Sequence, residues 1–167
     1  MSAIPREIAL TDAEVGELLT ACSIMRIASH GPGARINLTP MWFAWEAGAI
    51  YVWCRGQKLA NMRRDSRVTV LVDRGEQFAD LQGVMIDGTA TVLEDADAED
   101  GDAGLAVVRG GIGGKYAGQR EGARGTAETR TAAESSRRWV RIDPISIVSW
   151  DNTKLDRARH ARRREHG

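Results

Sequence analysis

The sequence contains few cysteines and has no excess of either charge. Its 167 residues include two cysteines, Cys22 and Cys54, too few and too far apart for a disulfide framework or a Cys-x-x-Cys zinc site, and no metal is expected. The 23 acidic and 23 basic residues cancel, which excludes a uniformly basic nucleic-acid-binding chain. No apolar run approaches the roughly 18 residues that a membrane-spanning helix needs.

The N-terminus also lacks the apolar segment of a secretory signal, so we expect a cytoplasmic protein without a membrane partner. Length and composition fit one globular domain, which we place at residues 1–153. Residues 154–167 form a basic C-terminal tail. This tail has no aromatic residues interleaved for base stacking, so nucleic acid is not an expected partner.

Hydrophobic periodicity predicts a mainly β (α+β) fold. Thr11 and Glu14 have capping-box spacing at the start of a helix over 11–22. The acidic run 94–102 suits the start of a second helix, the glycines of 110–114 predict a flexible loop, and 117–136 predicts a mobile segment. Six strands with short connections indicate an antiparallel barrel with helices outside. We expect these strands at residues 23–29, 35–45, 49–54, 68–73, 81–93 and 138–150.

Two local features indicate chemistry. Pro40 lacks an N–H donor, which places its strand at an edge, at a bulge or against a ligand. Arg55, Lys58 and Asn61 surround the start of a short helix over 58–64, where free backbone N–H groups and positive side chains suit a phosphate. A solvated basic helix face explains the same spacing. Lys58 is one of only three lysines in the chain, which favours the phosphate interpretation.

Four stretches together resemble the flavin/deazaflavin-binding split β-barrel superfamily, the pyridoxamine 5′-phosphate oxidase-like group, and within it the actinobacterial flavin/deazaflavin oxidoreductases of the B class. The match covers about residues 8–95 and 138–155. The resemblance implies a six-stranded antiparallel split β-barrel with peripheral helices. The stretches are Arg35-Ile-Asn-Leu-Thr-Pro-Met-Trp-Phe43, Ile50-Tyr-Val-Trp53, Arg55-Gly-Gln-Lys-Leu-Ala-Asn-Met-Arg-Arg-Asp-Ser-Arg-Val68 and Leu81-Gln-Gly-Val-Met-Ile-Asp-Gly-Thr-Ala-Thr-Val92.

The resemblance further implies a homodimer with two cofactor sites at its interface. The cofactor's phosphate would lie against Arg55 and Lys58, the strand 37–42 would line its rings, and the C-terminal segment would reach the partner's site. Trp150 has an equal alternative as a core or dimer-interface residue. The implied cofactor-binding residues are Asn37, Thr39, Pro40, Met41, Trp42, Arg55, Lys58, Leu59, Asn61, Gln82, Trp150 and Lys154.

The sequence departs from the pattern of pyridoxamine phosphate oxidases at two places, and these departures favour one activity of the superfamily over another. True pyridoxamine phosphate oxidases carry a basic residue where Asn37 stands, and an Arg-x-His motif that the segment 150–155 lacks. We therefore expect a coenzyme F-420-dependent oxidoreductase that passes a hydride between the deazaflavin and a small electron-poor substrate, without a catalytic side chain. The alternatives are an FMN-dependent enzyme of the same fold and a non-catalytic flavin-, deazaflavin- or haem-binding protein.

Overall fold

The computed structural model describes residues 4–116 and 136–155, except for the side chains of residues 112–116. Three short helices accompany the strands: α1 (Asp12–Ala21), α2 (Gln57–Arg64) and α3 (Ala96–Asp100), followed by the longer α4 (Ala103–Tyr116). Single 3-10 turns are η1 (Arg6–Ile8), η2 (Pro32–Ala34), η3 (Phe78–Asp80) and η4 (Asn152–Lys154). The strands are β1 (Ile24–His30), β2 (Ile36–Trp42), β3 (Ala44–Glu46), β4 (Ala49–Cys54), β5 (Arg67–Arg74), β6 (Gln82–Leu93) and β7 (Arg138–Asp151).

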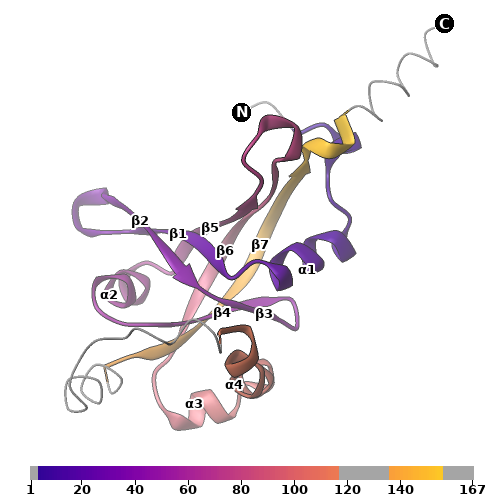
Figure 1. Ribbon diagram of the computed structural model, residues 1–167. Helices are drawn as coiled ribbons and strands as arrows, with labels where there is room; N and C mark the ends of the chain where they lie inside the picture. The colour runs from indigo at the N-terminus through magenta and orange to yellow at the C-terminus, as the bar shows by residue number, and fades with distance from the viewer. Residues whose placement is uncertain (1–3, 117–135, 156–167) are drawn as a thin grey trace, which may run out of the picture.

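These strands form one curved antiparallel sheet in the order β2-β1-β5-β6-β7-β4-β3, with the helices at its periphery (Figure 1). The predicted split-barrel fold is confirmed. The described part of the chain has seven strands rather than six, because the expected strand over 35–45 divides at Phe43. Its side chain is 1% exposed in the core, and beyond it β3 pairs with β4 instead of continuing along β1. The short β3 adds the seventh strand.

The main core lies on the inner face of this sheet. Alternate residues of β5 and β6, such as Val70, Val72, Val84 and Ile86, are fully buried there, as the period-two pattern requires. Helix α1 covers part of this face, and its predicted capping box is present, with Thr11 Oγ1 accepting from the Glu14 backbone N–H. β2 is an edge strand of the sheet, as Pro40 predicted.

A second, smaller core joins α4 to β4 and β7. Leu105 is fully buried against Tyr51 and Trp139, and Asp102 caps the helix by accepting from the Leu105 backbone N–H at 2.9 Å. The glycines at 110–114 lie within α4, so the predicted flexible loop is wrong here. Glycine costs a helix about 1 kcal/mol relative to alanine, and the packing of α4's first turns outweighs that cost. The predicted mobile segment falls almost wholly outside the described residues.

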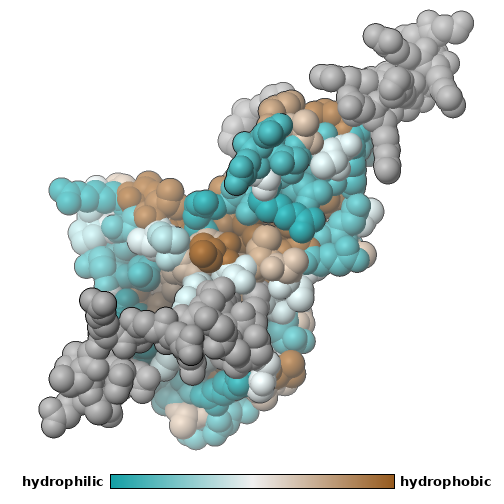
Figure 2. Space-filling view, in the orientation of Figure 1, coloured by the Kyte–Doolittle hydropathy of each residue, from teal (hydrophilic) through white to brown (hydrophobic). Residues whose placement is uncertain are grey.

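The outer face of β1 and β2 carries large exposed apolar side chains beside one ion pair, Arg26–Asp73. Antiparallel partners directly opposite one another point to the same side, so Ile24 lies beside Trp42 on this face and Leu38 follows along the same strand. Ile24, Ile36, Leu38 and Trp42 are 50%, 63%, 63% and 45% exposed. Figure 2 shows apolar surface in brown in this region. No helix among the described residues is long and apolar enough to cross a membrane.

Candidate functional site

The predicted phosphate-binding residues lie where β4 passes into α2. Gly56 adopts a φ of +69°, which favours glycine, and turns the chain into the helix without providing a side-chain cap for α2. Arg55 is exposed and Lys58 half-buried, and neither forms an ion pair or hydrogen bond with another described residue. The start of α2 therefore combines backbone donors with two unpaired positive charges.

A third cation lies close to this turn. The guanidinium carbon of Arg137 lies 4.9 Å from the ring centroid of Trp53, which precedes the turn by two residues. The thiol of Cys54 between them is buried, and this burial raises its pKa to about 11, while the positive charges of Lys58, Arg137 and Arg63 act in the opposite direction. Positive charges thus converge on the end of β4.

Asn61 is fully buried and connects α2 to the sheet. Its side chain donates to Ser29 Oγ at 3.3 Å and accepts from Gln57 Nε2 at 2.8 Å and from an Arg64 guanidinium nitrogen at 3.2 Å. Leu59, another predicted cofactor residue, is 3% exposed in the main core. The structure thus places Lys58 at the surface of α2. Asn61 and Leu59 point from α2 toward the sheet, where they hold the helix in position.

The predicted ring-lining strand β2 presents its residues alternately to two sides. Asn37, Thr39 and Met41 lie on the inner side, opposite core residues of β1, whereas Pro40 and Trp42 lie on the outer, apolar face. Thr39 Oγ1 is buried and has no hydrogen-bond partner among the described residues. An unpaired buried hydroxyl is costly, which makes this atom the one polar position on the inner side of β2 that stands out among the described residues.

The remaining predicted residues lie at the paired ends of β6 and β7. Gln82 pairs with Asp151, and the indole of Trp150 covers Gly83 so closely that a Cβ there would lie 2.2 Å from its Cζ2 atom. Lys154 in η4 donates to Glu14 Oε2 at 2.7 Å and to a backbone carbonyl at 3.1 Å. This ion pair lowers the pKa of Glu14 to about 2.

One chain does not bring the twelve predicted residues together. Figure 1 places α2 and η4 at opposite ends of the sheet, so the residues predicted to bind phosphate and the C-terminal segment lie far apart. Two further arginines near α2 are already engaged. Arg63 forms a two-point ion pair with Glu94, and Arg64 donates to the His30 carbonyl.

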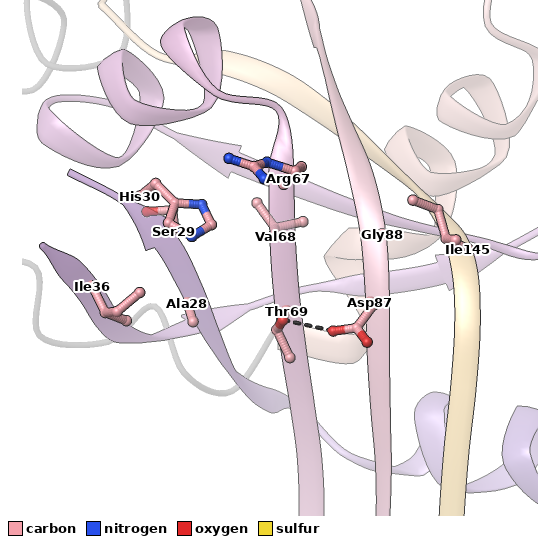
Figure 3. A pocket seen from close by; sticks show the side chains of 10 residues that line it. All are labelled: Ala28, Ser29, His30, Ile36, Arg67, Val68, Thr69, Asp87, Gly88 and Ile145. Atoms are coloured by element: carbon pink, nitrogen blue, oxygen red, sulfur yellow. Dashed lines mark hydrogen bonds between the residues drawn. The ribbon is translucent and has the colours of Figure 1, made fainter. Parts of the chain in front are cut away.

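A pocket of about 280 Å³ lies elsewhere, on the outer face of the sheet where β1, β5, β6 and β7 pass one another (Figure 3). At its centre, the Asp87 carboxylate accepts from Thr69 Oγ1 at 2.7 Å and from Ser146 Oγ at 3.3 Å. Arg67 lies at the rim and forms an ion pair with Asp65 at 2.7 Å, which holds the pKa of that carboxyl well below its usual range. None of the twelve predicted residues lines this pocket.

A model of the family described as pyridoxamine 5′-phosphate oxidase matches residues 11–151. The chain belongs to this family. No curated protein matched the sequence.

Solved structures support the same fold. A conserved hypothetical protein from Mycobacterium tuberculosis, Rv2991, is 28% identical over 93% of both chains with a TM-score of 0.70. An FAD-binding protein from Mesorhizobium loti is 22% identical over 84% of this chain and 93% of its own, with a TM-score of 0.58. A structure described as an F420 reductase is 16% identical over 78% and 93%, with a TM-score of 0.57. The last two similarities show the fold alone.

Arg137 is a cation near the turn before α2 that the sequence alone did not indicate. It lies just before β7, outside the expected strand, and its neighbour Trp53 is 84 positions away in the chain. Two arginines before a tryptophan, at 137–139, were the only local signal. Recognising the site required the pairing of Trp53 with Trp139, which the register of β4 and β7 provides.

Proposed function

We propose that the chain is an oxidoreductase that binds coenzyme F-420 and transfers a hydride between it and a small electron-poor organic substrate. The observation that carries the proposal is the group of unpaired cations at the start of α2, because phosphate is the ligand that such a cluster fits best. The unpaired Thr39 hydroxyl on β2 supports a polar ring system beside that strand.

When bound, the cofactor supplies the hydride chemistry, and the side chains of this chain bind and orient it. Arg55 and Lys58 would hold the phosphate, and the inner side of β2 would hold the rings in register with it. Asn61 fixes α2 against β1, which itself pairs with β2, so the two parts of the site keep a constant separation. No side-chain nucleophile is needed for this role.

We further propose that two copies assemble through the apolar outer face and that η4 of one copy completes the site of the other. Four large apolar side chains exposed together on β1 and β2 are typical of a protein–protein interface. The distance between α2 and η4 within one chain supports a contribution from a second copy. Leu38→Glu should then abolish both dimerisation and cofactor binding, as measured by analytical ultracentrifugation and titration. Val107→Glu, on the exposed face of α4, is the matched control and should change neither.

The proposal is tested by fluorescence titration of the purified protein with F-420 and with FMN. We expect tighter binding of F-420, and an increase of at least about tenfold in its dissociation constant for Lys58→Ala. Arg109→Ala, which removes an equal charge from α4, should bind as the wild type does. Tighter binding of FMN would contradict the deazaflavin assignment. Binding of F-420 without turnover on a panel of quinones, enones and nitro compounds would instead indicate a carrier or sensor.

A further inference from the structure

Arg137 is a cation whose position is fixed by aromatic rings. Its guanidinium lies over Trp53, and the Trp53 ring stacks on Trp139 with 6.1 Å between centroids and 20° between planes. A cation over an aromatic face is attracted by the ring, so this contact restrains the Arg137 side chain. The two stacked indoles therefore hold the Arg137 guanidinium in place before any ligand arrives.

These donors lack an acceptor among the described residues. Arg137 Nε is buried and has no hydrogen-bond partner, and no described carboxylate forms an ion pair with this guanidinium. A buried N–H of a permanently charged group is costly to leave unpaired. Two other arginines of this region differ in this respect, since Arg63 pairs with Glu94 and Arg141 pairs with Asp143. The ligand group that best fits these N–H donors is an oxyanion, because it offers both negative charge and hydrogen-bond acceptors.

The register of the sheet brings Arg137 to the turn before α2. β4 and β7 pair Trp53 with Trp139 and Cys54 with Arg138, so the next residues along the two strands are Arg55 and Arg137. Lys58 and Arg137 both exert their charge on the buried Cys54 thiol. The three cations without described partners thus surround the same end of β4.

We propose that Arg137 is a third binding residue of the phosphate site, and that the Trp53–Trp139 stack positions its guanidinium for the phosphate oxygens of the cofactor. This inference rests on the proposed function, which assigns the phosphate to Arg55 and Lys58. The ligand class is a phosphate ester, because a guanidinium fork matches two of its oxygens at once. Trp53 and Trp139 act through Arg137 and are positioning residues.

The test compares two probes that differ only in the phosphate, FMN and riboflavin. Arg137→Gln should raise the dissociation constant for FMN at least about tenfold and leave that for riboflavin within about twofold. Arg137→Lys keeps the charge and loses the fork, so its effect should be intermediate. The control Arg109→Gln should leave both constants unchanged. If the wild type binds only deazaflavins, F-420 and its phosphate-free parent deazaflavin replace the two probes.

The role of the stack is tested at Trp53. Trp53→Phe keeps an aromatic face and should preserve FMN affinity, whereas Trp53→Leu should weaken FMN and spare riboflavin, in variants shown to be folded by their melting temperatures. Unchanged FMN binding by Arg137→Gln, or an equal loss for both probes, would overturn the inference while leaving the proposed function standing. A wild type that binds no flavin or deazaflavin at all would overturn the proposed function itself.

Discussion

Replacing Asn61 separates a structural role from direct contact with the cofactor. The side chain is 0% exposed and forms three hydrogen bonds, to Ser29, Gln57 and Arg64. At about 1 kcal/mol of net stability for each bond, Asn61→Ala should lower the free energy of unfolding by about 3 kcal/mol. For a domain of this size, that loss corresponds to a decrease in melting temperature of roughly 6–12 °C.

Urea unfolding followed by tryptophan fluorescence measures this loss. Ser29→Ala is the matched control, because it removes one partner of Asn61 and should cost only about 1 kcal/mol. The double variant should cost less than the sum of the two single variants, since the Asn61–Ser29 bond would be counted once. Cofactor affinity should decrease only as far as α2 shifts. An Asn61→Ala protein of unchanged stability that no longer binds cofactor would refute this reasoning and show direct contact.

Three further variants test other parts of the structure. Gly83→Ala places a Cβ where the indole of Trp150 lies. It should lower the free energy of unfolding, measured by urea unfolding, by about 1–3 kcal/mol. An unchanged free energy of unfolding would mean that the Trp150 ring does not pack on Gly83. The pKa of Glu14 is lowered to about 2 from its ordinary 4.5. The ion pair with Lys154 therefore stabilises the fold fully above pH 4.5, and this stabilisation is lost as the pH falls toward 2. The difference in melting temperature between wild type and Glu14→Gln should shrink over that range. Burial raises the pKa of Tyr51 to about 12, so its hydroxyl stabilises the fold below pH 10 and this advantage is lost as the pH rises to 12. Tyr51→Phe should have a free energy of unfolding lower than that of the wild type by about 1–3 kcal/mol at pH 7. A difference between the two proteins that stays constant from pH 7 to about 12 would contradict this.

The sequence predicted well wherever a local pattern determines the structure. Alternating apolar residues located the strands, Pro40 placed β2 at the sheet edge, and the Thr11–Glu14 spacing identified the helix cap. The glycines at 110–114 misled, because their local preference opposes helix formation and distant packing partners decide the outcome. Leu105 and Val108, which anchor α4 to the sheet, lie before those glycines and carried no periodic signal strong enough to extend the helix across them.

The candidate site was only partly predictable for the same reason. Spacing located Arg55 and Lys58, but it could not show that Asn61, three residues further on, turns inward to hold the helix rather than outward to a ligand.

Net charge does not reveal such a local site. A chain with as many acids as bases can still hold a local positive site, because ion pairs such as Arg63–Glu94 and Arg141–Asp143 neutralise some basic residues and leave others without a described partner. Three such cations without a described partner lie at one end of β4, namely Arg55, Lys58 and Arg137. A binding site for an anion is therefore defined by the cations that the fold does not pair. Their identity depends on strand register and aromatic stacking, which only the three-dimensional structure provides.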